Sequence, residues 1–243
     1  MRKHLALIFA SLGLVAVAAG LTGCSMAADI SIPDDAFISG KTQETGHGEN
    51  NGLINAIATL RRTDGGVMYL RVDTETRAEI ANPEIVESIG EGHRVLVQYY
   101  KLTVAPSSAF FTCMARINLV SSIVEGYVRA MTGGDLAAGM ASSDPIDIVD
   151  DWISNAEDGF LTLHYKMMAG GQKAHRFILG YDAANPASLT LMHFADGDSG
   201  QTLTEGMICF PLDFLPADFT GEISLVYKPI SGGTVTTKYN TGI

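Results

Sequence analysis

Three histidines in the second half of the chain could together bind a metal ion. His164, His175 and His193 each lie in a short strand-like segment, and imidazoles on neighbouring strands can bind zinc. Alternation along a strand places His164 on the face of Thr162 and Lys166, and the other two histidines on apolar faces. No nearby glutamate suits the general base of zinc hydrolysis. We therefore expect no metal site, a solvent-facing His164, and inward-facing His175 and His193 that form hydrogen bonds or contact a ligand.

A group of aspartates opens the region before these histidines. Paired carboxylates can act as acid and base in glycoside cleavage, but the sequence does not fix the separation that this reaction needs. The first aspartate precedes a proline, which is typical of a turn, and Ile146, Ile148 and Trp152 have the pattern of strand residues. We expect a structural role, with carbohydrate or cation binding as the alternative and Asp147 as a candidate ligand contact. The group consists of Asp144, Asp147, Asp150 and Asp151.

The loop Gly197-Asp198-Ser199-Gly200 resembles the loop around the nucleophile of chymotrypsin-like proteases. That chemistry also needs a histidine base and a buried aspartate, and no histidine here has the protease context. The same loop could be compared with an EF-hand calcium loop that starts at Asp196. Such a loop needs an oxygen ligand at its fifth position, glycine at its sixth and glutamate at its twelfth. Gly200 stands fifth, Gln201 sixth and Glu205 tenth. We expect a polar hairpin loop and no catalytic residue.

These residues must be positioned by β-strands, because strand patterns dominate the chain from Leu53 onward. An Asp-Gly turn at residues 63–66 joins the first two strands, residues 74–91 are irregular, and residues 122–131 continue the sheet or cross to the next domain. Several strands within ~70–80 residues predict a small barrel over residues 53–122. The strands are expected at residues 54–61, 67–73, 93–100 and 109–120.

A second run of strands at regular spacing predicts an antiparallel β-sandwich over residues 123–243. Residues 132–145 are rich in glycine and are expected to be a flexible stretch followed by a turn. We expect no helix of three turns after the leader, and therefore an all-β fold. The strands are expected at residues 145–153, 159–168, 175–181, 188–195, 207–214, 222–228 and 234–239.

Charge and cysteine content restrict the partners. Without residues 1–23 the chain has 14 basic and 27 acidic residues, and most of the acidic excess lies in residues 123–243. Residues 53–122 carry seven residues of each sign, so neither region attracts nucleic acid. Cys113 and Cys209 could form a disulfide outside the cytoplasm, but their apolar segments favour two buried free thiols.

The first residues have the three parts of a secretory signal. Met1-Arg2-Lys3-His4 is cationic, Leu5 to Gly20 is apolar, and Leu21-Thr22-Gly23-Cys24 resembles a bacterial lipobox, in which cleavage follows Gly23 and the cysteine is acylated. The alternative is an uncleaved membrane span, but the run is near the lower limit of ~17–25 residues and the cysteine has the right position. We expect Cys24 to attach the chain to the bilayer and residues 24–52 to form a flexible tether.

Several stretches taken together resemble a known family, the NigD-like lipoproteins of Bacteroidetes, over nearly all of the mature chain. The resemblance implies an N-terminal OB-type barrel and a C-terminal β-sandwich. An OB barrel needs five strands and four are clear, so the fifth is expected within residues 122–131 or 74–81. The stretches are the lipobox, Gly92-His93-Arg94-Val95-Leu96-Val97, residues 144–153, Phe160-Leu161-Thr162-Leu163 with His175-Arg176, and Leu189-Thr190-Leu191-Met192-His193.

The expected function is that of a non-enzymatic envelope lipoprotein without a cofactor. The leading expectation is an envelope binding or accessory scaffold that works through protein or envelope contacts. The family's name, which comes from association with a bacteriocin operon, implies a link to bacteriocin protection. A carbohydrate-binding accessory protein is the alternative, and an unrecognised hydrolase is least favoured. Ser25 does not resemble an inner-membrane retention signal, which favours the outer membrane.

OB barrels often bind nucleic acid or oligosaccharide through basic and aromatic residues, but the barrel's zero net charge argues against nucleic acid. The candidate contacts on this barrel are Tyr69, Arg71, Arg94, Tyr99 and Tyr100. Of these, Tyr69, Arg94 and Tyr99 join Asp147, His175 and His193 as the residues expected to contact a ligand.

Overall fold

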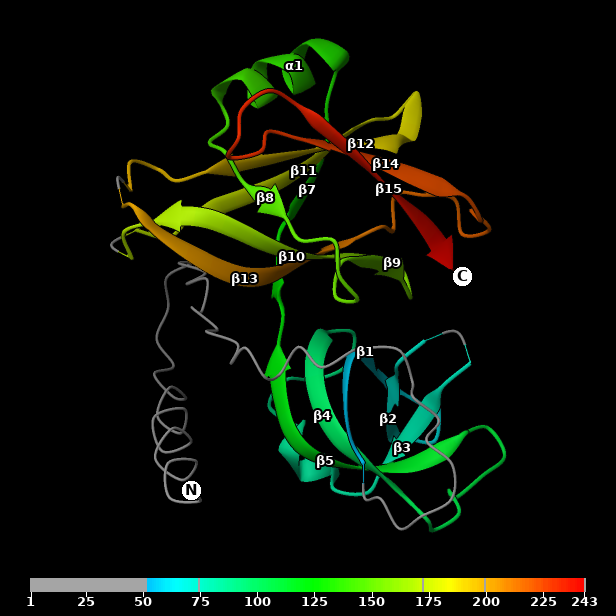
Figure 1. Ribbon diagram of the computed structural model, residues 1–243. Helices are drawn as coiled ribbons and strands as arrows, with labels where there is room; N and C mark the ends of the chain where they lie inside the picture. Colours follow the sequence, from blue (N-terminus) through cyan, green and yellow to red (C-terminus); the bar gives the residue numbers. More distant parts are fainter. Residues whose placement is uncertain (1–51, 74, 172, 199, 243) are drawn as a thin grey trace, which may run out of the picture.

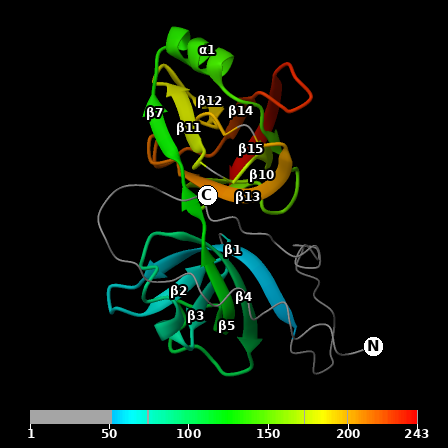
Figure 2. The same ribbon diagram turned by 90° about the vertical axis from the view of Figure 1, so that its left-hand side faces the viewer.

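The computed structural model describes residues 52–242 except positions 74, 172 and 199, and it shows two β domains, one above the other (Figures 1 and 2). A small closed barrel forms the N-terminal domain and a larger sheet forms the C-terminal domain. The predicted all-β class, with a barrel followed by a sandwich, is confirmed. The expected leader, tether and lipid attachment site at Cys24 lie outside the described residues.

The barrel closes in the order β1-β2-β3-β5-β4, as a five-stranded OB-type barrel does. Its neighbours pair antiparallel except β3 and β5, which pair in parallel. The strands are β1 (Leu53–Arg62), β2 (Met68–Arg71), β3 (Arg77–Ile80), β4 (Arg94–Leu102) and β5 (Cys113–Ser122), with a 3-10 turn at Pro83–Ile85.

The fifth barrel strand is β3, so of the two ranges expected for it residues 74–81 are right. Residues 122–131 instead carry the chain into the second domain as β6 (Val124–Glu125) and β7 (Tyr127–Ala130). The strand expected from residue 109 begins only at Cys113, which leaves Phe110 and Phe111 in the β4–β5 loop.

Alternation along β1 builds two cores at once. Ala58 and Leu60 are fully buried inside the barrel, while Ile57 faces the other way. Ile57 packs with Ile153 and Met207 of the second domain, so one strand contributes to the barrel core and to the domain junction. The two cysteines lie in different cores and are free and buried, which confirms the expectation of two thiols.

The C-terminal domain packs two layers of strands around a common apolar core. One layer runs β6-β13-β10-β9, with β8 also on β10, and the other runs β15-β14-β12-β11-β7. Parallel pairing of β15 with β9 joins the layers. The strands after β7 are β8 (Asp147–Ile148), β9 (Asn155–Glu157), β10 (Phe160–Ala169), β11 (Arg176–Asp182), β12 (Asn185–Phe194), β13 (Thr202–Pro211), β14 (Glu222–Tyr227) and β15 (Val235–Gly242).

Two expected strand boundaries are wrong for local reasons. The strand expected over residues 145–153 shrinks to β8, because the Asp151 carboxylate accepts hydrogen bonds from the Ile153 and Ser154 amides and makes a turn there. The strand expected from residue 188 begins three residues earlier, at Asn185, as β12. The preceding turn is made by Asp182, whose carboxylate accepts from the Ala184 amide.

Helix α1 (Gly133–Ser142) corrects the expectation that residues 132–145 would be a flexible stretch followed by a turn. With ten residues it has just under three turns. Thr132 caps it by accepting from the Asp135 amide at 3.2 Å, and its hydroxyl donates to the Asp135 carboxylate. Gly139 brings the helix close to the sheet, since a Cβ there would lie 2.3 Å from the Met192 sulfur. The glycine that weakens the helical signal in sequence is therefore what lets the helix pack.

Candidate functional site

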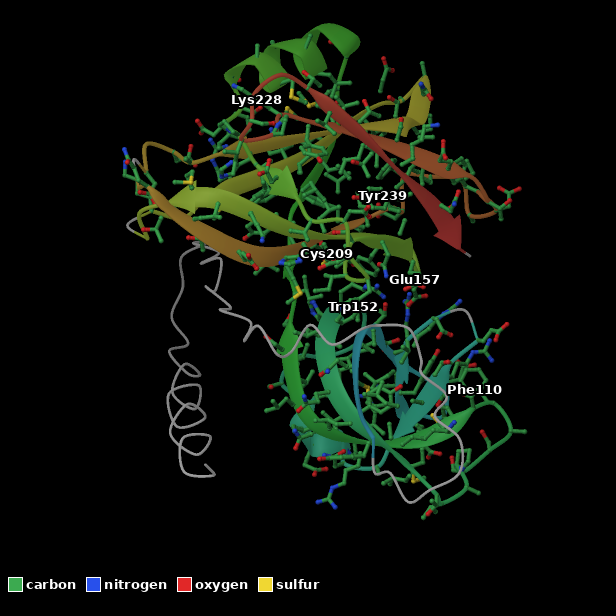
Figure 3. The ribbon with its side chains drawn as sticks, in the orientation of Figure 1. Phe110, Trp152, Glu157, Cys209, Lys228 and Tyr239 are labelled. Atoms are coloured by element: carbon green, nitrogen blue, oxygen red, sulfur yellow. The ribbon has the colours of Figure 1, made fainter. Side chains whose placement is uncertain are left out.

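An open cleft on the barrel is the candidate functional site. The β1–β2 loop forms one wall and the β4–β5 loop the other, with Tyr69 of β2 between them. Its volume is about 590 Å³, and Figure 3 shows Phe110 at the outer edge of the barrel, away from the sandwich. The lining residues are Arg62, Thr63, Asp64, Gly65, Val67, Tyr69, Ser107, Ser108, Phe110 and Phe111.

Three aromatic rings form the apolar part of this cleft. Phe110 lies edge-on to Tyr69 at 5.4 Å between ring centroids, and edge-on to Phe111 at 5.1 Å. Tyr69 and Phe111 are buried, whereas Phe110 is 43% exposed. Edge-to-face packing fixes the rings relative to one another, so Phe110 presents a preformed apolar contact to solvent.

Polar contacts hold both walls in place. The buried carboxylate of Glu79 accepts from the Ser107 amide at 2.6 Å, which fixes the β4–β5 loop to β3. Arg62 donates to the Gly66 carbonyl at 2.8 Å across the β1–β2 loop. Arg77 places its guanidinium 4.8 Å from the centre of the Phe110 ring and so covers part of it.

The cleft is lined by few ionisable side chains. Arg62 and Asp64 are the charged residues among those that line it, and no histidine or second carboxylate converges there. An apolar cluster with a few polar groups around it is typical of a recognition site. In the described part of the chain, no three His, Cys, Asp or Glu residues are placed to share a metal ion.

Tyr69 is the one expected ligand contact that lines the cleft. Arg94 is buried at the domain junction, and Tyr99 is buried in the barrel core, where burial raises its pKa to about 12. Asp147 of β8 accepts from the Ile230 amide at 2.9 Å and so connects β8 to the β14–β15 loop. The structure therefore does not bring the expected contacts together into one site.

His175 and His193 face inward, as alternation predicts, and belong to a buried hydrogen-bonded chain. His175 Nδ1 lies 2.8 Å from His193 Nε2, His175 Nε2 lies 3.3 Å from the Asp198 carboxylate, and His193 Nδ1 lies 3.2 Å from the Pro145 carbonyl. Hydrogen bonds from the Gly170 amide and from His175 hold the pKa of Asp198 below its usual value. Burial and the neighbouring His175 lower the pKa of His193 to about 4.

His164 is buried, so the expectation that it faces solvent is wrong. Alternation identified its face of β10 correctly, but that face is covered by a second layer. The segment after β8 places Asp151 there, with Oδ2 at 2.7 Å from His164 Nδ1, and the barrel covers the neighbouring Thr162 through Arg94. A pattern of alternating residues cannot show that both faces of a strand are covered.

Phe110 and Phe111, the residues that define the cleft, were missed in the sequence because they were placed inside a strand. Pro106-Ser107-Ser108 directly before them is a turn signal, and it would have indicated an exposed loop with an aromatic tip. Their position opposite the β1–β2 loop depends on barrel closure, and local sequence carries no signal for it.

Together these features define a two-domain all-β protein in which an OB-type barrel carries an open cleft and a sandwich follows it. Residues 130–241, most of the second domain, match the family described as NigD-like C-terminal beta sandwich domain. The resemblance noted in the sequence is thereby confirmed. A comparison with curated protein sequences found no match.

Solved structures share this two-domain fold. A proposed toxin-related protein from Parabacteroides distasonis is 23% identical with a TM-score of 0.63, over 78% of this chain and 94% of that one. A NigD-like immunity protein from Bacteroides caccae is 18% identical with a TM-score of 0.50, over 80% and 99% of the two chains. A proposed lipoprotein from Bacteroides fragilis is 9% identical with a TM-score of 0.52, over 78% and 97%. No helix among the described residues has the length and apolarity to cross a bilayer.

Proposed function

We propose that this protein is a non-enzymatic, lipid-anchored binding protein of the cell envelope whose barrel cleft receives an apolar side chain of a protein partner. The observation that carries the proposal is Phe110, a half-exposed ring held by buried aromatic neighbours between two fixed loops. Rigid aromatic anchors of this kind dominate binding energy at protein interfaces. The absence of converging acid and base groups among the cleft's lining residues supports binding rather than catalysis.

A bacteriocin or another secreted polypeptide is the proposed partner. The link rests on the family match of the sandwich and on the Bacteroides caccae neighbour, which is described as a NigD-like immunity protein. Glycan binding remains the second candidate, because aromatic rings also stack on sugars. One face of Phe110 is occupied by Arg77, which leaves less open ring surface than a sugar platform needs.

Anchoring at the outer membrane is proposed from the leader, in which Leu21-Thr22-Gly23 precedes Cys24 and Ser25 follows it. The Bacteroides fragilis neighbour of the same fold is described as a proposed lipoprotein. Several acyl chains on one cysteine would give stable anchoring without a spanning helix.

Replacing Cys24 by serine is expected to abolish incorporation of labelled palmitate and to release the protein from the membrane fraction, because serine lacks the acylated thiol. Labelling of native cells followed by membrane fractionation measures both effects. Cys113→Ser is the matched control, since this buried thiol contributes nothing to anchoring. Retention of the label in Cys24→Ser would overturn the assignment of the lipid site.

Replacing Phe110 by alanine is expected to weaken partner binding by at least roughly tenfold, as truncation of an aromatic anchor does. The measurement is capture of partners from native envelope extracts, with affinity then determined for the captured polypeptide. Leu119→Ala is the control, because Leu119 is a similarly exposed apolar residue on the same barrel outside the cleft. Equal loss in both variants, or binding of envelope polysaccharide in place of protein, would contradict a protein partner at the cleft.

A further inference from the structure

We infer that Asp158, a residue of the sandwich, positions one wall of the barrel cleft, so that the two domains form a single binding unit. This inference rests on the proposed function, because it concerns the same cleft. It adds that the recognition surface of the barrel depends on a side chain from the other domain.

Asp158 lies in the two-residue loop of the β9–β10 hairpin, which points from the sandwich to the barrel. Asp158 and Gly159 connect β9 to β10 and both have positive φ, 50° and 78°, as in a type I′ turn. Aspartate and asparagine tolerate this conformation at the first position. The turn therefore fixes the direction of the Asp158 carboxylate, which is 7% exposed.

Two arginines of the barrel share this carboxylate. Arg61 Nη2 lies 3.0 Å from Asp158 Oδ2, and Arg61 Nε donates to the same oxygen at 3.2 Å. Arg71 Nε lies 3.1 Å from Oδ1, as an ion pair without the alignment of a hydrogen bond. Each carboxylate oxygen thus has its own guanidinium, and both arginine side chains are about one-third exposed, so the pairs are partly shielded from solvent.

The two arginines come from the two strands that carry the cleft wall. Arg61 is on β1 and Arg71 is on β2, the antiparallel pair joined by the β1–β2 loop. Arg61 lies opposite Tyr69, the aromatic residue between the walls, and precedes Arg62, which lines the cleft. One carboxylate therefore holds both strands of the hairpin at the base of the loop.

Holding the domains together would not by itself require this arrangement. Arg94 and the apolar cluster around Ile57 already join the barrel to the sandwich. The Asp158 contacts differ because both partners belong to the hairpin that forms the cleft wall. Since coupling between sites is reciprocal, a ligand in the cleft would also strengthen the contact between the domains.

The decisive measurement is hydrogen–deuterium exchange of the mature chain, residues 24–243, produced without its leader. Asp158→Asn keeps the turn, because asparagine tolerates the same φ, and removes only the charge. In Asp158→Asn we expect the amides of residues 63–67 to exchange at least roughly fivefold faster than in the parent protein, because the strands that hold this loop are less firmly fixed. Asp196→Asn is the matched control. Asp196 also has a positive φ, 49°, and precedes a glycine. Its partner Arg176 belongs to the same domain, and the pair lies on the surface of the sandwich.

Binding of 1-anilinonaphthalene-8-sulfonate, an aromatic anion, separates this inference from the proposed function. If Phe110→Ala abolishes probe binding, we expect Asp158→Asn to weaken it severalfold and Asp196→Asn to leave it unchanged. Unaltered exchange of residues 63–67 in Asp158→Asn overturns the inference whatever the probe does. Loss of loop protection in Asp158→Asn together with full probe binding by Phe110→Ala supports the positioning role and counts against the cleft as the binding site.

Discussion

Replacing Arg94 by alanine is expected to lower the free energy of unfolding by about 3 kcal/mol, because it removes a fully buried side chain on which both domains converge. Arg94 Nη1 donates to the Thr59 hydroxyl of the barrel at 3.1 Å, and Nε donates to the Thr162 hydroxyl of the sandwich at 3.3 Å. Its guanidinium lies 5.9 Å from the centre of the Phe160 ring, over which it packs. Alanine would leave a cavity and two hydroxyls without this donor.

The size of the effect depends on packing more than on charge. Burial lowers the pKa of Arg94, and burial raises the pKa of the nearby Glu157 carboxyl, so the charged forms are poorly solvated at the junction. Glu157 Oε2 is 4.0 Å from Arg94 Nη2, which is long for a compensating pair. Figure 3 shows Glu157 between the two domains together with Trp152 and Cys209.

Arg94→Met is therefore expected to lose less than half as much stability as Arg94→Ala, because methionine fills much of the space without a charge to desolvate. Urea denaturation of residues 24–243 measures both variants. Arg176→Ala is the control, since its pair with Asp196 is exposed and worth at most about 1 kcal/mol. Equal losses in Arg94→Met and Arg94→Ala would show that the polar contacts decide the stability of the junction.

The two-domain architecture could be predicted because alternation and turn residues report local burial. Ala56, Ala58 and Leu60 repeat every second residue and do form the barrel core. Helix α1 could not be predicted in the same way, because it depends on packing between Gly139 and Met192, which are far apart in the sequence. His164 was misplaced for a related reason, since its polar face is covered by a segment that folds back over β10.

The candidate site was less predictable than the fold. Tyr69 could be selected as an aromatic residue of a barrel strand. Phe110 lies in a loop about forty residues after Tyr69, and it contributes to the cleft only because the closed barrel brings that loop next to Tyr69. Arg94 was instead selected as a ligand contact although it does not line the cleft. A basic residue in an OB-type barrel suggests ligand contact, yet here it is used to join the domains. Composition cannot distinguish these roles, because both need an arginine near aromatic rings.

Acidification from pH 7 to pH 4 is expected to destabilise the protein through His193. Its pKa is about 4 in the folded state, lowered first by burial and then by His175, against 6.5 for an unperturbed histidine. Between these values the unfolded chain binds more protons, so stability is fully present above pH 6.5 and is lost as the pH falls towards 4. Since one pKa unit corresponds to about 1.4 kcal/mol, the contribution is about 3 kcal/mol.

The hydrogen bonds around His193 explain why its ring stays neutral in the folded protein. The contacts Asp198–His175, His175–His193 and His193–Pro145 form three hydrogen bonds. A neutral His193 donates from Nδ1 to the Pro145 carbonyl and keeps Nε2 as an acceptor for His175 Nδ1 at 2.8 Å. A second proton on His193, at Nε2, would remove this acceptor and break the contact with His175. Asp144 also faces His193, but its carboxylate is occupied by the Ala195 amide.

His193→Gln is therefore expected to be less stable than the parent at pH 7 and to lose much less stability on acidification, because glutamine does not titrate. The free energy of unfolding from urea titrations at pH 4, 5, 6 and 7 gives the slope for each protein. His93→Gln is the matched control, since His93 is an exposed histidine of the barrel and its removal is expected to leave the slope unchanged. A slope in His193→Gln as steep as in the parent would assign the acid sensitivity to other groups, with His164 and its partner Asp151 as the next pair to test.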